Sequence, residues 1–133
     1  MTRLNQNDLS QFQNILSKMK NSEQKELESI SQRLSEILEN GKDENNTDTT
    51  SYSIQVESLM NSKNRVMKHL KHIENALLRI TNNTYGLCIE TGKAIPKERL
   101  IAVPTTTMSI EGKQIREKRT NQNSIRHESY KKI

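Results

Sequence analysis

Two long stretches of the chain repeat apolar residues at alternating spacings of three and four. The second stretch contains Val56, Leu59, Lys63, Val66, Leu70, Ile73, Leu77 and Ile80, with Lys63 as its single polar interruption. An apolar residue at about every 3.5 positions forms a stripe on one face of a helix and packs helices as a left-handed coiled coil. We therefore predict a long helix here, and we expect Met60 and Met67 to widen its apolar stripe.

The first stretch has a similar pattern, which predicts a second long helix. Its apolar positions are Leu9, Phe12, Leu16, Met19, Leu27, Ile30, Leu34 and Ile37. Asn7 or Asp8 is suited to cap its start, and Asn40-Gly41 is suited to end it. We expect residues 9–19 to pack on the region after the second helix, and residues 27–37 to pair with that helix.

The segment between the two stretches, residues 42–51, contains no apolar side chain and is therefore a turn or a tip. A short polar loop that joins two seams of similar length favours an antiparallel hairpin within one chain. At 1.5 Å per residue, the paired part spans roughly 35–45 Å. The alternative is a linker between two helices that pair with other chains.

Composition agrees with an elongated helical protein. Hydrophobic residues make up 31% of the 133 residues and aromatic residues 3%, both low for a compact core. One cysteine excludes an intrachain disulfide framework. No apolar run approaches about 18 residues and no signal-peptide pattern is present, which predicts a cytoplasmic protein without a membrane partner.

The net charge of +5 is unevenly placed. Residues 1–87 carry 11 Lys/Arg and 11 Asp/Glu, whereas residues 88–133 carry 10 Lys/Arg and 5 Asp/Glu. A basic end suits an acidic protein surface, a nucleotide or nucleic acid. A solvated charged tail is the simpler alternative for residues 120–133.

A further pattern follows the second helix. It consists of Tyr85, Gly86, Cys88, Gly92, Ile95, Leu100, Ala102 and Pro104 in fixed register. This set resembles the C4 zinc finger of the DksA/TraR family, Y-G-x-C-x2-C-G-x2-I-x4-L-x-A-x-P-x4-C-x2-C. Cys88 occupies the first of its four metal-ligand positions, and Thr91, Ser109 and Gly112 occupy the other three.

The residues at these four ligand positions argue against zinc. Structural zinc requires four thiolate or imidazole ligands in a tetrahedron, and here one thiolate is left. We therefore expect no bound zinc. Thr91 and Ser109 are candidates to hydrogen-bond across the site, and apolar residues are candidates to replace the metal as a clamp: Leu87, Ile89, Ile95, Leu100, Ile101, Val103, Met108 and Ile110.

The resemblance implies a mainly α fold. We expect a long antiparallel two-helix coiled-coil hairpin, a small zinc-finger-like globular region and a C-terminal helix. The expected organisation is an N-terminal helix and coiled-coil hairpin at 1–84 with a hairpin tip at about 41–52, a degenerate finger-like region with the C-terminal helix at 85–119, and a basic tail at 120–133 that need not be ordered.

The resemblance also implies a function. DksA-like proteins regulate transcription by placing a coiled-coil tip in the secondary channel of bacterial RNA polymerase, near the active site. The family's tip motif D-x-x-D-x-A falls on Asn45, Asp48 and Thr50 of this chain. One of its two acidic residues is kept, and Asp43 and Glu44 are candidates to supply the missing charge.

Basic residues complete the predicted site. Arg65 and Lys113 fall where the family has polymerase or ppGpp contacts, His72 occupies a position typical of lysine, and Arg99 keeps a finger arginine. ppGpp, the nucleotide of the stringent response, is therefore a candidate effector.

The chain contains no catalytic constellation, so we predict a binding protein and not an enzyme. Two other functions stay open: a coiled-coil structural or dimerisation protein, and nucleic-acid binding through the basic C-terminal region. The polymerase interpretation requires contact with nucleic acid only through that partner.

Overall fold

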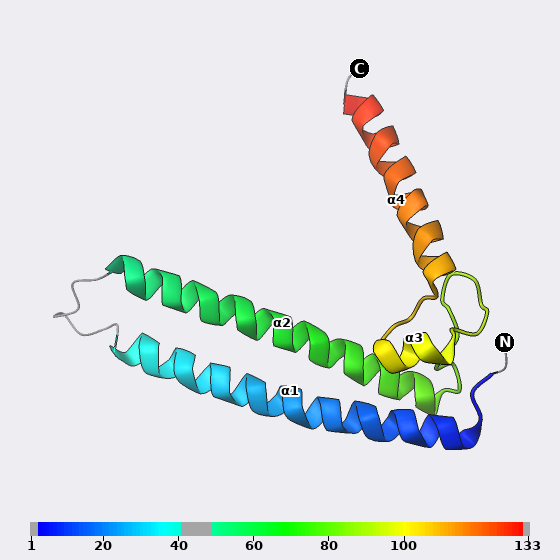
Figure 1. Cartoon of the computed structure of the whole chain (residues 1–133). Helices are drawn as coiled ribbons and strands as arrows, with labels where there is room; N and C mark the ends of the chain where they lie inside the picture. Colours follow the sequence, from blue (N-terminus) through cyan, green and yellow to red (C-terminus); the bar gives the residue numbers. More distant parts are fainter. Residues whose placement is uncertain (1–2, 41–48, 132–133) are drawn as a thin grey trace. The chain divides into compact units, whose positions relative to one another are not determined.

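The described part of the chain contains four helices (Figure 1). The computed structural model describes the backbone of residues 3–40 and 49–131, and the side chains of residues 3–40 and 50–123. The helices are α1 (Gln6–Asn40), α2 (Thr49–Thr81), α3 (Lys97–Ala102) and α4 (Ile110–Lys131). Within this part of the chain the only β-type pairing is an isolated antiparallel bridge between Leu87 and Ala94. The mainly α prediction is confirmed.

The chain divides into two compact units. One unit consists of Asn14–Asn75, and the other consists of Met1–Gln13 together with Ala76–Ile133. We refer to them as the hairpin unit and the finger unit. The long helices α1 and α2 each contribute residues to both units.

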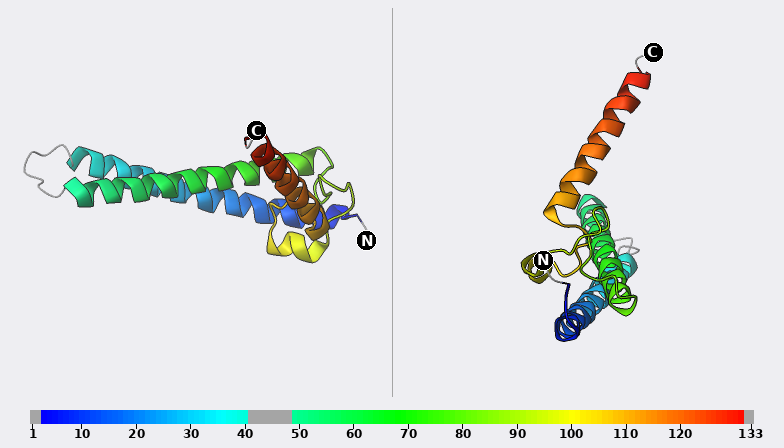
Figure 2. Two further views of the ribbon diagram at one scale, coloured as in Figure 1. Left: turned by 90° about the horizontal axis from the view of Figure 1, so that it is seen from above. Right: turned by 90° about the vertical axis from the view of Figure 1, so that its right-hand side faces the viewer.

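In the hairpin unit, α1 and α2 lie side by side and run antiparallel, as the views of Figures 1 and 2 agree. The predicted seams explain the pairing, because every seam position that the unit contains is buried or half-buried. Four of these positions are the most enclosed: Leu16, Ile30, Leu70 and Ile73, at 0%, 5%, 8% and 0% exposure. The predicted antiparallel hairpin is therefore confirmed.

Two ion pairs join the helices beside this seam. The Lys20 Nζ atom lies 3.9 Å from Glu74 Oε1, and His69 Nδ1 lies 3.4 Å from Glu23 Oε1. Their side chains are between 27% and 55% exposed, so water screens both pairs. Apolar burial along the seam, and not these ion pairs, is the main source of stability in the hairpin unit.

The expectation that Met60 and Met67 widen the buried stripe is wrong. Each methionine is 50% exposed. The two positions lie outside the three–four repeat, and two paired helices can cover only a narrow stripe of each other's surface. The apolar seam is therefore limited to the heptad positions.

The start of α1 also differs from the expectation, because its cap is Asn5 and not Asn7 or Asp8. Asn5 Oδ1 accepts a hydrogen bond from the Asp8 amide at 2.8 Å, and Asp8 Oδ2 accepts one from the Asn5 amide at 3.3 Å. This reciprocal arrangement is a capping box, in which the acidic residue occupies the third helical position. Asp8 is thus a partner of the cap.

Two further boundaries differ from the sequence-based expectation. α2 begins at Thr49, so residues 49–52 are helical although the hairpin tip was expected to extend to about residue 52. α4 continues to Lys131, so the backbone is helical through most of the expected tail. In the described ranges, no helix is both long enough and apolar enough to cross a membrane.

The core of the finger unit forms around Tyr85. Its ring packs on Phe12 of α1 with centroids 5.5 Å apart, and both side chains are nearly inaccessible. Burial raises the pKa of Tyr85 to about 12, against the opposing charge of Arg79. The phenol therefore stays protonated and donates to the Pro104 carbonyl at 2.8 Å. The other buried apolar residues of this unit are Ala76, Cys88, Ile95 and Leu100.

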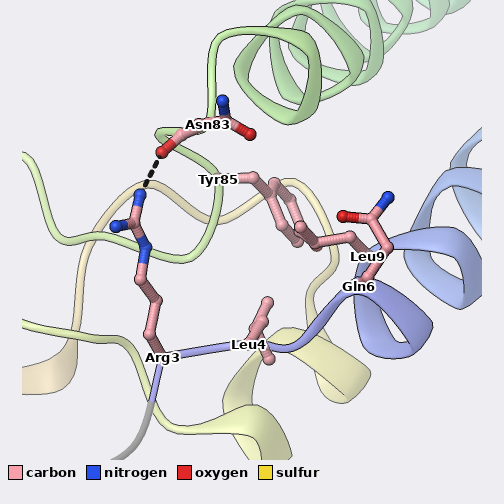
Figure 3. Close-up of a pocket in the computed structure, with 6 residues that line it drawn as sticks. All are labelled: Arg3, Leu4, Gln6, Leu9, Asn83 and Tyr85. Carbon is pink, nitrogen blue, oxygen red and sulfur yellow. Dashed lines mark hydrogen bonds between the residues drawn. The ribbon is translucent and has the colours of Figure 1, made fainter.

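The residues before α1 contact the turn that precedes Tyr85 (Figure 3). The Arg3 Nη2 atom donates to the Asn83 carbonyl at 2.6 Å, beside a hollow of about 300 Å³. Leu4 and Leu9 both line this hollow, at the two positions of a hydrophobic staple around the Asn5 cap. Lys97 Nζ adds an ion pair to Asp8 Oδ1 at 2.8 Å. These side chains thus tie the start of α1 to the rest of the finger unit.

The seam predicts that two apolar residues of α2 differ sharply in how much they contribute to the free energy of unfolding. Replacing fully buried Ile73 with alanine should lower the free energy of unfolding by about 2–5 kcal/mol, because it leaves a cavity. Replacing half-exposed Met67 with alanine should change it by no more than about 0.5 kcal/mol. Urea unfolding followed by circular dichroism measures both. Equal losses would contradict the seam.

Candidate functional site

The first half of the finger-like site is a tight loop around Cys88. The Ile95 amide donates to the Gly86 carbonyl at 2.7 Å, and the Cys88 amide donates to the Lys93 carbonyl at 2.8 Å. Gly92 closes the turn with φ of 73°, a left-handed conformation that favours glycine. Its amide donates to the Cys88 carbonyl at 2.8 Å. The loop encloses the Cys88 side chain, which is 2% exposed.

The second half of the site is the start of α4. Ser109 Oγ accepts a hydrogen bond from the Gly112 amide at 3.0 Å, and the Ser109 carbonyl accepts one from the Lys113 amide at 2.9 Å. These are the bonds of a helix N-cap. The Ile89 amide also donates to the Thr107 carbonyl at 2.9 Å, which joins the two halves. A position that holds a metal ligand in the family motif here holds the cap of a helix.

The four ligand positions converge on the sulfur of Cys88. Ser109 Oγ donates to Cys88 Sγ at 3.5 Å. Gly112 approaches so closely that a Cβ atom built on it would overlap the same sulfur. Burial raises the pKa of the Cys88 thiol, but hydrogen bonds with Thr91 and Ser109 outweigh burial and lower it to about 6. The expected hydrogen bond across the site is therefore present for Ser109.

This donor set does not fit zinc. A tetrahedral site needs four strong ligands about 2.0–2.3 Å from a central ion. Here one thiolate meets two hydroxyls and a glycine, and a side chain at the glycine position would overlap the sulfur. Among the described residues, no group of three or more His, Cys, Asp or Glu side chains is placed to hold a metal ion.

Of the eight apolar residues expected as candidates for the clamp, half are enclosed and half are not. Ile95 and Leu100 are buried and Leu87 and Met108 are half-buried, as expected. Four others are exposed by 46–62%: Ile89, Ile101, Val103 and Ile110. Ile89 belongs to the loop, whereas Ile101 lies on α3, Val103 follows it and Ile110 begins α4, so the four are spread over separate segments.

Sequence reasoning missed one polar contact that joins the two halves. Glu90 lies between Cys88 and Thr91, and its carboxylate pairs with Arg116 and Arg119 of α4. The only signal in the sequence was the spacing of the two arginines, which places them on one face of a helix. Nothing in the pattern identified Glu90 as their partner.

Most of the predicted tip lies outside the described residues. This applies to Asp43, Glu44, Asn45 and Asp48. Thr50 is described, and it is exposed in the first turn of α2.

The predicted basic contacts belong to both units. Arg65 and His72 are exposed on α2 in the hairpin unit, and Arg65 Nη2 donates to Ser62 Oγ at 3.1 Å. Lys113 is exposed on α4 in the finger unit. Arg99 is half-buried there, and its Nε atom donates to the Met108 carbonyl at 2.8 Å. The structure thus gives Arg99 a role in holding the chain segment before α4.

Comparisons with known proteins agree on one group. The profile of the prokaryotic dksA/traR C4-type zinc finger matches residues 83–118. The RNA polymerase-binding transcription factor DksA of Caulobacter vibrioides is 40% identical over 60 residues, which cover 45% of this chain and 42% of that protein. General stress protein 16O of Bacillus subtilis is 35% identical over 89 residues, 67% of this chain and 54% of that protein.

A solved structure extends the likeness beyond the finger. Transcription factor DksA2 from Pseudomonas aeruginosa superposes with a TM-score of 0.80, at 28% sequence identity and over 88% of each chain. By sequence, the chain spans about half the length of the two curated relatives described above.

The contact between Gly112 and Cys88 predicts that replacing this helical glycine with alanine destabilises the protein, which is the opposite of the usual effect. Alanine is normally favoured over glycine in a helix by about 1 kcal/mol. Replacing Gly112 with alanine should instead lower the free energy of unfolding by about 1–3 kcal/mol, because the new Cβ atom overlaps Cys88 Sγ. Urea unfolding followed by circular dichroism checks this.

The control for this substitution removes the sulfur. In a Cys88→Ala background, Gly112→Ala should cost less than it does in the wild type, because the overlapping atom is gone. A stabilising effect of Gly112→Ala in the wild type would contradict the close packing of these two residues.

Proposed function

Because this chain belongs to the DksA/TraR family, with a cysteine-depleted C4 finger, we propose that it binds bacterial RNA polymerase and regulates transcription. The observation that carries the proposal is the structural likeness to DksA2 over 88% of both chains. A likeness confined to the finger would support a shared module only. Here it also includes the helical hairpin, which in this family is the part that acts on the polymerase.

We propose entry through the secondary channel of the polymerase. Two paired helices form a narrow unit, because each helix satisfies its own backbone hydrogen bonds and buries its apolar seam against the other. The part of α1 in the hairpin unit, Asn14–Asn40, has a length of about 40 Å at 1.5 Å per residue. A unit of this length and width suits a deep and narrow channel. The residues between α1 and α2 would then lie near the active site.

The hairpin tip is the proposed acting part, with Asp43, Glu44, Asn45, Asp48 and Thr50 as its candidate residues. Asp48 is the acidic residue that the family motif retains, whereas Asn45 offers hydrogen bonds without a charge. Arg65, His72 and Lys113 are proposed contacts to the polymerase or to ppGpp, since all three are exposed. Arg99 is a weaker candidate because its guanidinium already bonds the chain.

The two alternative functions, a coiled-coil structural or dimerisation protein and a nucleic-acid-binding protein, receive less support. Pairing of the α1 and α2 seams within one chain accounts for their apolar residues without a second copy. In the basic C-terminal region, Arg116 and Arg119 are engaged by Glu90 and so offer less positive charge to nucleic acid. We propose a cytoplasmic protein that acts by binding and not by catalysis.

Polymerase binding and the action of the tip can be tested separately. Immobilised protein should retain purified RNA polymerase, and the same protein should alter initiation in a defined transcription reaction. Asp48→Ala should leave retention nearly unchanged, because one ion pair that water screens contributes about 0–1 kcal/mol to binding, and should abolish the effect on initiation. Ser53→Ala, an exposed position on α2, is the matched control.

A second secondary-channel factor provides the competition arm of this test. Its addition should displace the protein from the polymerase. If the polymerase is still retained at saturating competitor, entry through the secondary channel is contradicted. If no polymerase is retained at all, the polymerase is not the partner.

We also propose that the finger-like site works without zinc. The support is the donor set around Cys88 and the close approach of Gly112. Elemental analysis of purified protein should find far less than one zinc ion per chain, and excess EDTA should leave the thermal midpoint unchanged. Zinc in a one-to-one ratio, or unfolding by the chelator, would refute this proposal.

A further inference from the structure

We propose that an ionic clamp, made of Glu90, Arg116 and Arg119, takes the place of the metal in joining α4 to the finger loop. Arg116 Nε lies 2.9 Å from Glu90 Oε1, and Arg119 Nη2 lies 3.2 Å from Glu90 Oε2. Each carboxylate oxygen therefore has its own guanidinium partner. The Glu90 side chain is 8% exposed, and the arginine side chains are 49% and 62% exposed.

The clamp connects the same two segments that a C4 zinc ion connects. In the family motif the first pair of ligands corresponds to Cys88 and Thr91, and Glu90 stands between them. The second pair corresponds to Ser109 and Gly112, at the start of the helix that carries both arginines. A bond from Glu90 to this helix therefore closes the same loop of chain.

α4 has few other means of attachment. Among residues 110–123 of this helix, Gly112 alone is buried, and it has no side chain. Ile110 and Ile115 are 62% and 38% exposed. Apolar burial therefore contributes little to holding this helix. The remaining contacts are the Ser109 cap and the packing of Gly112 on Cys88, both in the first turn. The two arginines extend the attachment to the second and third turns.

The environment of Glu90 makes this contact stronger than a surface ion pair. The Glu90 carboxylate is largely removed from water and therefore needs charged partners, whereas the two guanidinium groups stay partly in water. Both of its oxygens are engaged by arginine, whose hydrogen bonds to a carboxylate are charge-assisted. Loss of Glu90 removes both contacts together, whereas loss of one arginine leaves the other.

Hydrogen–deuterium exchange of the full-length protein tests the clamp, with the amides of residues 114–123 as the reporter. Glu90→Gln should speed their exchange by about tenfold, equivalent to ~1.4 kcal/mol. Arg116→Gln/Arg119→Gln should have a similar effect, and either arginine alone a smaller one. Excess EDTA should leave the exchange rates unchanged.

Charge-matched variants serve as controls. Glu117→Gln removes a carboxylate from α4, and Lys113→Gln/Lys118→Gln removes two positive charges from it, all at exposed positions outside the clamp. Neither variant should speed exchange of residues 114–123. Amides of residues 20–37 in the hairpin unit report on general unfolding and should be unaffected in every variant.

Two outcomes would overturn the proposal. In the first, the double arginine variant exchanges no faster than the double lysine variant, which shows that α4 is held by other contacts. In the second, EDTA itself speeds exchange in the wild type, which shows that a metal holds the helix. If Glu90→Gln unfolds the whole finger unit, the double arginine variant decides, because it changes exposed side chains only.

Discussion

The contact between the sulfur of Cys88 and the backbone of Gly112 is the constraint from which the finger unit follows. It brings the start of α4 against the loop of residues 86–95. This loop has almost no core of its own, since Cys88 and Ile95 are its two buried apolar side chains. A side chain at position 112 would separate the two parts. The absence of one lets Ser109 cap α4 and bond the sulfur at the same time.

Around this contact, several weak interactions join the chain segments that a single metal ion joins in a C4 zinc finger. A metal concentrates four bonds on a single ion, and its removal unfolds many small domains. Here the same two chain segments are joined by the Ser109 hydrogen bonds, by the Ile89–Thr107 backbone bond and by the Glu90 ion pairs. Each is worth on the order of 1 kcal/mol, so the unit depends on their sum and on the packing of Tyr85 against Phe12.

Much of the fold could be predicted because it depends on regular spacing. The three–four repeat identified both long helices, and with the polar loop between them it predicted their antiparallel pairing. The positions of the repeat from Val56 to Ile80 are buried or half-buried, as the pairing requires. Local chemistry was harder to place. Aspartate is a common N-cap residue, yet Asp8 is the partner of the Asn5 cap. The two positions of a capping box both favour short polar or acidic residues, so residue type alone did not tell them apart. Met60 and Met67 are apolar but lie beyond the width of a two-helix seam.

The amino-acid sequence by itself determined the helices, the hairpin, the family and the loss of three metal ligands, since each of these follows from residue types at fixed spacing. Only the tertiary structure decided what replaces the metal. Glu90 and the two arginines are 26 or more positions apart, and no periodic pattern relates them. The same holds for Gly112, whose role is to leave space for Cys88 Sγ. Spacing along the chain specifies which face of a helix a residue occupies, but contacts between distant segments depend on how those faces meet.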